Sequence, residues 1–102
     1  MSPRRTRYSL REIRRLVEGY EAILARRDTT EFGIRAIVAV LDIRMGIRTL
    51  PQGLRAVLLL HGVLGLSALD TSRALEISER AVRQRYADAL AHLEWRLNGG
   101  SY

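Results

Sequence analysis

Three helical patterns follow one another between residues 50 and 97, separated by a glycine-containing break and a tight turn. The first begins at Pro51, which suits the first turn of a helix because that position needs no backbone N–H donor. The second is short and follows Gly65-Leu66-Ser67. The third follows Ile77-Ser78, where the Ser78 hydroxyl can accept from the N–H groups of the next turn. We therefore predict helices over about residues 51–64, 70–75 and from 79 onward. The last two form a helix-turn-helix, a motif whose second helix enters the DNA major groove.

Two more helices are predicted before residue 50. Ser9 and Glu12 have the spacing of a capping box, and apolar residues recur at helical spacing over residues 10–24, which predicts one amphipathic helix. A second helix over Glu31–Met45 follows a new cap at residues 28–30. It has apolar residues on more than one face, so we expect it to be the central, most buried helix.

The sequence thus predicts an all-α fold of about five helices around one combined core. Residues 1–8 would form a basic arm, residues 9–49 an N-terminal helical segment and residues 50–98 the part with the helix-turn-helix. A helix-turn-helix of about 50 residues is marginal alone, so we expect the two parts to fold together. Val40 and Leu41 of the central helix should both be buried in this core.

One face of the last helix carries side chains that can read DNA. We expect its apolar face to pack inward through Val82, Tyr86, Ala89, Leu90, Leu93 and Leu97. The outward side chains are then Glu79, Arg80, Arg83, Gln84 and Ala87, preceded by Ser78. Arginine can bind guanine O6 and N7, glutamine adenine N6 and N7, glutamate cytosine N4, and alanine a thymine methyl. We predict base contacts for Arg80 and Gln84 and a phosphate contact for Arg83. An ordinary solvated helix face is the alternative.

Positive charge is concentrated at the N-terminus. All 17 basic residues are arginine, whose guanidinium binds phosphate or guanine through two hydrogen bonds, although a GC-rich genome alone would also replace lysine by arginine. Of the net charge of +6, residues 1–27 supply +5, residues 28–50 none and residues 51–102 +1. We therefore predict phosphate or minor-groove contacts for Arg4, Arg5 and Arg7, a solubilising tail being the alternative. Arg73 of the short helix completes the predicted DNA-binding set.

A known family shares this order of helices and many residues of it. The positions that keep register without a gap are Leu50, Pro51, Arg55, Val57-Leu58-Leu59-Leu60, Gly65-Leu66-Ser67, Asp70, Ala74-Leu75, Ile77-Ser78-Glu79, Val82-Arg83, Arg85, Ala89-Leu90 and Leu93. On these positions, residues 50–93 resemble region 4 of bacterial sigma factors, which binds the promoter element farther from the transcription start site. The resemblance implies that Glu79, Arg80, Arg83 and Gln84 face the promoter, since Val82-Arg83-Gln84 is close to the Ile/Val-Arg-Gln of the family. It also implies RNA polymerase as a partner, because region 4 docks on it.

Some positions depart from the family pattern. Glu76 occupies the turn where many relatives have glycine, and a non-glycine residue in a left-handed conformation costs about 1 kcal/mol or more, so a reshaped turn is expected. Thr71-Ser72 stand where the family usually has an apolar residue and alanine, which predicts a less apolar contact for the short helix. Nothing before residue 50 resembles the sigma region that melts promoter DNA. A sigma-like regulator is therefore expected rather than a complete sigma factor.

Other function classes find little support in the sequence. The chain has no cysteine, and His61 and His92 have no second ligand at metal-binding spacing, so we expect no metal and no cofactor. No Ser/His/Asp set or phosphate-binding loop is visible, which predicts no catalytic residues and no enzyme. No apolar run approaches about 18 residues, and the basic start lacks the apolar segment of a signal peptide. We expect a cytoplasmic protein without a membrane partner.

These observations together predict a sequence-specific protein that binds double-stranded DNA as a sigma-like transcriptional regulator. One alternative is a phage small-terminase-like or replication module, since such proteins also join a helix-turn-helix to helical oligomerisation segments. Another is a protein that docks on RNA polymerase without DNA readout. A homodimer also remains open, because Trp95 and Tyr102 could either seal the core or join a dimer interface.

Overall fold

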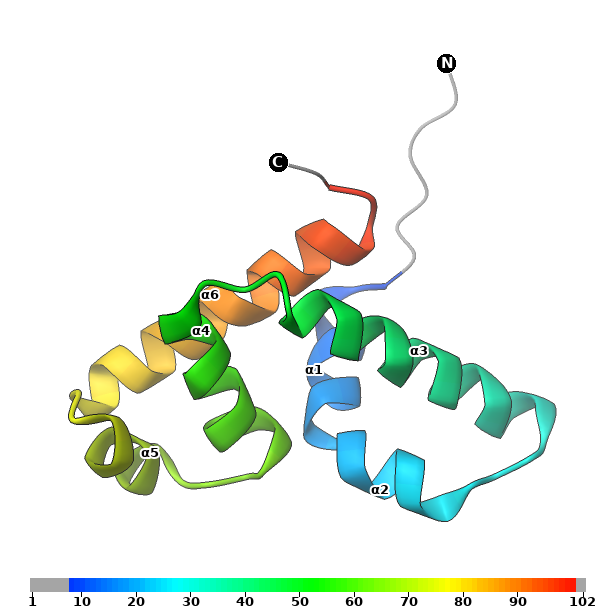
Figure 1. Ribbon diagram of the computed structural model, residues 1–102, viewed down its shortest axis with the longest axis horizontal. Helices are drawn as coiled ribbons and strands as arrows, with labels where there is room; N and C mark the ends of the chain where they lie inside the picture. The colour runs from blue at the N-terminus through cyan, green and yellow to red at the C-terminus, as the bar shows by residue number, and fades with distance from the viewer. Residues whose placement is uncertain (1–7, 101–102) are drawn as a thin grey trace.

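A computed structural model of the chain describes residues 8–100, which form six α-helices and one π-helical turn and contain no strand (Figure 1). The predicted all-α class is confirmed. The arm residues Arg4, Arg5 and Arg7 lie outside the described residues, as does Tyr102. The elements are α1 (Leu10–Glu18), α2 (Tyr20–Arg26), α3 (Glu31–Ile47), α4 (Gln52–Val57), η1 (Leu58–Val63), α5 (Ala68–Leu75) and α6 (Glu79–Leu97).

The first predicted helix is in fact two helices, α1 and α2, separated by Gly19. The expected cap is present, because the Ser9 hydroxyl accepts from the backbone N–H of Glu12 at 3.1 Å. Gly19 then leaves the helical conformation with φ −99° and ψ 7°. Glycine is a poor helix former, and the chain turns here, so that α2 runs back toward the start of α3 (Figure 1). The continuous apolar spacing hid this break, which raises the helix count from five to six.

The central helix is α6, and the expectation that Glu31–Met45 would be most buried is wrong. The long α6 packs against α1, α3, α4, α5 and η1, whereas α3 lies along one side of the molecule (Figure 1). Because neighbours cover only one face of α3, Val40 is fully buried while the next residue, Leu41, is 43% exposed. The exposed apolar side chains of α3 are Phe32, Ile34, Val38, Leu41 and Met45.

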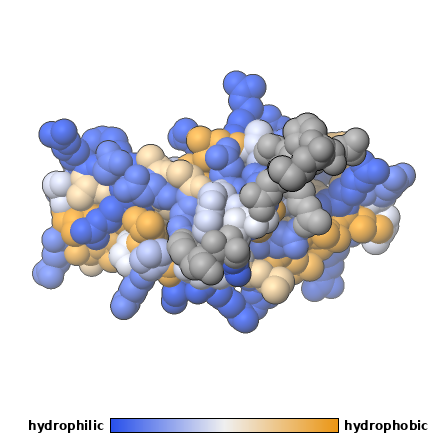
Figure 2. Space-filling model, turned by 90° about the horizontal axis from the view of Figure 1, so that it is seen from above, coloured by the Kyte–Doolittle hydropathy of each residue, from blue (hydrophilic) through white to orange (hydrophobic). Residues whose placement is uncertain are grey.

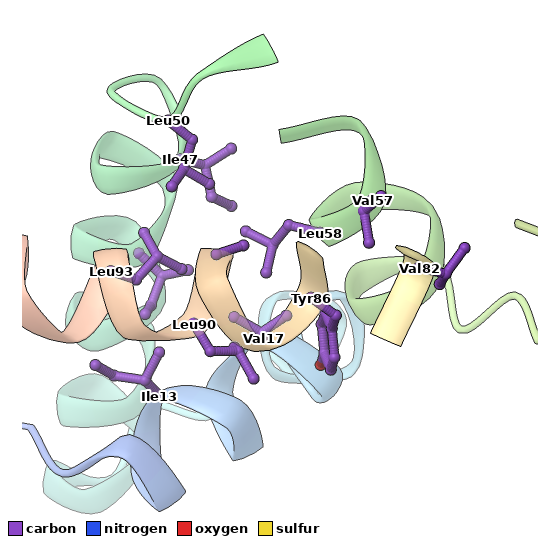
Figure 3. Close-up of a cluster of buried hydrophobic side chains, with 12 residues drawn as sticks. Ile13, Val17, Ile47, Leu50, Val57, Leu58, Val82, Tyr86, Leu90 and Leu93 are labelled. Atoms are coloured by element: carbon purple, nitrogen blue, oxygen red, sulfur yellow. The ribbon is translucent and has the colours of Figure 1, made fainter. Parts of the chain in front are cut away.

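The core joins both parts of the chain in one cluster. Ile13 and Val17 of α1 lie beside Leu90 of α6, and Ile47 of α3 lies near Leu93 (Figure 3). All the α6 residues expected to face inward belong to this cluster or pack against its edge, Leu97 being only partly buried. The cluster consists of Ile13, Val17, Ile43, Ile47, Leu50, Val57, Leu58, Val82, Tyr86, Ala89, Leu90 and Leu93.

Polar contacts also connect distant parts of the chain. The Tyr86 hydroxyl donates to Glu18 of α1 at 2.9 Å, and the Tyr8 hydroxyl donates to Asp42 of α3 at 2.9 Å. Burial raises the pKa of Tyr86, as does the hydrogen bond to Glu18, so this hydroxyl remains a donor at neutral pH. His61 is partly buried and packs edge-on against the Tyr86 ring, with the ring centroids 4.8 Å apart.

The π-helical turn η1 extends α4 and brings Gly62 into the core. Its end is closed by hydrogen bonds from the backbone N–H groups of Leu64 and Leu66 to the carbonyl groups of Leu59 and Leu60. None of the helices within residues 8–100 is long and apolar enough to cross a membrane.

Candidate nucleic-acid interface

Serine caps fix the start of both helices of the helix-turn-helix. The Ser67 hydroxyl accepts from the N–H of Asp70 at 2.9 Å, so α5 begins at Ala68, two residues before the predicted start. The Ser78 hydroxyl accepts from the N–H of Ala81 at 3.0 Å, at the predicted cap position of α6. Each cap satisfies an N–H group that lacks a partner within its helix, so both helix starts are well defined.

The turn between α5 and α6 keeps the left-handed conformation in spite of Glu76. This residue has φ 55° and ψ 45°, and its backbone N–H donates to the carbonyl oxygen of Ser72. The N–H of Ile77 donates to the same carbonyl at 3.0 Å, which is the hydrogen bond that closes a Schellman motif. The expectation of a reshaped turn is therefore wrong. The two hydrogen bonds and the packing of Ile77 against the core offset the cost of a non-glycine residue here.

Hydroxyl groups face inward from α5. Thr71 is fully buried and Ser72 nearly so, which agrees with the predicted loss of apolar contact in this helix. The Ser72 hydroxyl donates to the Leu69 carbonyl at 2.7 Å, whereas the buried Oγ1 of Thr71 has no partner among the described residues. The short helix is thus held by smaller and more polar side chains than an apolar core contact would supply.

The N-terminal half of α6 presents a continuous exposed face opposite the core. Arg80, Arg83, Gln84 and Ala87 are exposed, Glu79 is half-buried, and Ser78 is exposed just before the helix. Arg73 is exposed in the last turn of α5. The structure thus gathers the predicted DNA-binding residues of α5 and α6 around the turn, at the positive end of the α6 dipole. We call Arg73, Ser78, Glu79, Arg80, Arg83, Gln84 and Ala87 the outer face.

Two of these side chains are held by acidic neighbours one turn away. Arg83 pairs with Glu79 at 3.2 Å, and the Gln84 amide donates to Asp88 at 3.1 Å. Within residues 8–100, Arg80 has no side-chain partner, so its guanidinium is free to reach a ligand. Asp88 was missed by the sequence interpretation. The signal was the i,i+4 spacing of residues 79 with 83 and 84 with 88.

Arg55 has a structural role, because it closes the corner between α3 and α4. Its Nη2 atom donates to the carbonyl groups of Arg48 and Leu50 at 3.1 and 3.0 Å. This contact fixes the direction in which α4 leaves α3, and α4 in turn packs along α6. Arg55 therefore does not belong to the outer face, but it helps to hold α4 against α6, the helix that carries most of that face.

The described residues offer no competing metal centre, since residues 8–100 contain no group of three His, Asp or Glu side chains placed to hold a metal ion. An open hollow of about 670 Å³ lies between the C-terminal ends of α3 and α6, lined by Asp42, Thr49, Arg96 and Asn98 among others. It is at the opposite end of α6 from the outer face.

Comparison with known families agrees with this geometry. The family model described as sigma-70, region 4 matches residues 40–93, more than half of the 102 residues. The chain belongs to the sigma-70 region 4 family. The match starts inside α3, earlier than the resemblance from residue 50, and it runs through α4, η1 and α5 to residue 93, near the C-terminal end of α6. No curated protein and no solved structure matches the chain.

Membership in this family indicates what the helix-turn-helix binds. In the sigma-70 region 4 family this motif binds DNA in transcription, so α5 and α6 form a helix-turn-helix of the DNA-binding kind. The residues before 40, which include α1, α2 and the first half of α3, lie outside the match. In this chain they contribute Ile13 and Val17 to the core that supports α6.

Proposed function

We propose that this protein binds double-stranded DNA sequence-specifically as a sigma-like transcriptional regulator, with the N-terminal half of α6 in the major groove. The observation that carries the proposal is the outer face, which lies exposed next to a well-capped turn while the opposite side of α6 is buried in the core. A rigid helix that exposes arginine and glutamine near its N-terminus suits direct readout of base edges.

Each side chain of the outer face receives a role from its surroundings. Arg80, which has no partner within residues 8–100, is assigned to guanine. Gln84 is assigned to adenine, with Asp88 orienting its amide. Arg83 and Arg73 are assigned to phosphates, and Glu79 holds Arg83 in place. Ser78, Glu79 and Ala87 lie at the contact surface, where Glu79 can accept from cytosine and Ala87 can touch a thymine methyl.

Selection of binding sites from random duplex DNA tests this function, followed by single substitutions. On the selected site, Arg80→Ala and Gln84→Ala should each cost about 1–3 kcal/mol and relax preference at one base pair. Arg83→Ala should instead weaken all sequences alike and make the salt dependence shallower. Arg48→Ala, which removes an exposed arginine outside both the outer face and the basic residues 1–27, is the matched control and should change little. Equal losses on selected and random DNA for Arg80→Ala would contradict base readout.

The basic arm should add affinity without specificity. We assign Arg4, Arg5 and Arg7 to phosphate or minor-groove contacts, because residues 1–27 hold +5 of the net charge of +6. Deletion of residues 1–7 should weaken binding to every DNA and reduce the salt slope, with helix content by circular dichroism almost unchanged. If affinity at low salt stays the same, the arm is a solubilising tail.

One observation favours a second candidate, docking on RNA polymerase without DNA readout. Both Arg83 and Gln84 are already bonded to acidic side chains, and residues 51–102 carry a net charge of only +1. If no duplex is enriched in the selection while the protein is retained by purified bacterial RNA polymerase, this second function replaces the first.

A further inference from the structure

The side of α3 that faces away from the core is an apolar stripe. Ile34, Val38, Leu41 and Met45 are 50, 52, 43 and 69% exposed, and their spacing of four, three and four residues puts them on one line along the helix. Figure 2 shows hydrophobic surface on the side of the molecule where α3 lies. The outward face of a surface helix is normally polar, so four aligned apolar residues indicate a surface that another helix covers. We call these four residues the α3 stripe.

The spacing of the α3 stripe is that of the a and d positions of a coiled coil. Arg35 and Asp42 then occupy the same flanking position, seven residues apart on one side of the stripe. The other side has Ile37 and Arg44. One flank of the stripe therefore carries one positive and one negative charge, about two turns apart. When two copies of the helix run in opposite directions, the positive charge of each copy lies opposite the negative charge of the other.

We propose that the α3 stripe is the interface of a homodimer in which the two α3 helices pack antiparallel about a twofold axis. Val38 then packs against Leu41 of the partner subunit, and Ile34 against Met45 of the partner subunit. Arg35 lies opposite Asp42 of the partner subunit, and the symmetry makes this pairing twice. A parallel arrangement would place Asp42 beside Ile37 of the partner subunit and leave the charges unpaired, so the charges select the antiparallel one.

The charged side chains are available for this contact. Arg35 uses Nη2 to reach Glu31 at 3.2 Å and is 77% exposed at its side chain, so it can still donate from its other nitrogens. Among residues 8–100, Asp42 accepts only the Tyr8 hydroxyl, through Oδ2, which leaves Oδ1 for a partner. The outer face at the start of α6 lies on the other side of the molecule from α3 (Figure 1), so dimerisation leaves both DNA-binding surfaces exposed.

Sedimentation equilibrium without DNA tests the dimer independently of the proposed function. The wild-type chain should show twice the monomer mass of 11.6 kDa at high protein concentration and dissociate on dilution. Leu41→Arg places a charge in the middle of the α3 stripe and should give a monomer at every concentration, with unchanged helix content because the side chain points outward. Leu64→Arg is the matched control, since Leu64 is 54% exposed in the bend after η1, away from α3, and it should dimerise like the wild type. A monomeric wild type, or a dimer that survives Leu41→Arg, overturns the proposal.

A charge exchange tests the antiparallel geometry. Arg35→Glu and Asp42→Lys should each weaken dimerisation about tenfold, because each puts two like-charge contacts across the interface. An equal mixture of the two variants should form a heterodimer as tightly as the wild type. In that heterodimer the two introduced side chains face each other with opposite charges, and the remaining Asp42 faces the remaining Arg35. The loss of the Tyr8 hydrogen bond in Asp42→Lys cannot cause such a recovery, because that loss is also present in the mixture. If mixing gives no recovery, the pairing is not antiparallel through this flank and the proposal fails.

Discussion

At the scale of single residues, two glycines of neighbouring elements have opposite environments. A Cβ atom on Gly62 would lie 2.7 Å from Val17 Cγ1 and 2.8 Å from Tyr86 Cε1, both inside the core. A Cβ atom on Gly53 would meet only the tip of Arg85, at 3.7 Å. Gly62→Ala should therefore lower the free energy of unfolding by about 1–3 kcal/mol through overpacking. Gly53→Ala should raise it by about 0.5 kcal/mol, since alanine is the better helix former. Urea unfolding of both variants checks the pair, and a stable Gly62→Ala protein would contradict the close packing of η1 on α1 and α6.

The buried hydroxyl of Thr71 is a second prediction at this scale. Its Oγ1 is buried without a hydrogen-bond partner among residues 8–100, and an unpaired buried hydroxyl costs free energy. Thr71→Val keeps the shape of the side chain and removes that cost, so it should raise the free energy of unfolding by about 1 kcal/mol. Thr71→Ser retains the hydroxyl but loses the methyl group, and should destabilise. Loss of stability in Thr71→Val would mean that Oγ1 has a partner in solution.

At the scale of elements, two adjacent residues of α3 have opposite environments: Val40 is buried in the core and Leu41 is partly exposed on the outward side. Val40→Asp would place an unpaired charge in the core and should unfold the protein, because that cost rivals the stability of a domain this size. Leu41→Asp should leave the fold intact, because this side chain is 43% exposed. Far-ultraviolet circular dichroism with thermal melting compares the two. Equal destabilisation would show that the outward side of α3 supports the monomer fold.

The sequence predicted elements well where each depends on its own residues. The caps at Ser9 and Ser78 and the inward spacing of α6 follow from local chemistry, and the structure contains them. The break at Gly19 was missed because the apolar spacing continues through it. The exposure of α3 was missed for another reason. Apolar spacing shows that a face is covered, but it does not say whether the same chain or another one covers it.

The candidate site was predictable in its residues and less so in their contacts. Once the apolar positions of α6 are assigned to the core, the remaining positions near its N-terminus must be exposed, and the structure places these residues outward as expected. Glu76 was expected to disturb the turn, yet the hydrogen bonds of Glu76 and Ile77 to Ser72 preserve it. Such compensation depends on how the whole turn packs, which the identity of one residue does not reveal. The DNA contacts themselves stay a prediction.

At the scale of the whole molecule, the helix-turn-helix rests on residues from outside the family match. Ile13 and Val17 of α1 are fully buried in the same cluster as Leu58 and Leu90, and the Tyr86 hydroxyl bonds to Glu18 across 68 positions of sequence. Removal of the first half would expose this side of α6 and η1 to water. A remaining unit of about 50 residues buries little surface and is marginal alone.

We therefore expect a fragment of residues 50–102 to lack a cooperative thermal transition and to bind the selected DNA site poorly. The whole chain should unfold in one transition, coincident by circular dichroism and by the fluorescence of Trp95. Val17→Ala in the whole chain is a milder variant that tests the same support of α6 by α1. It removes core contacts of α1 without removing the helix, and should lower the melting temperature of that single transition. A fragment that melts cooperatively and binds the same site with the same affinity would show two independent units. The N-terminal half would then serve dimerisation or partner binding rather than support of α6.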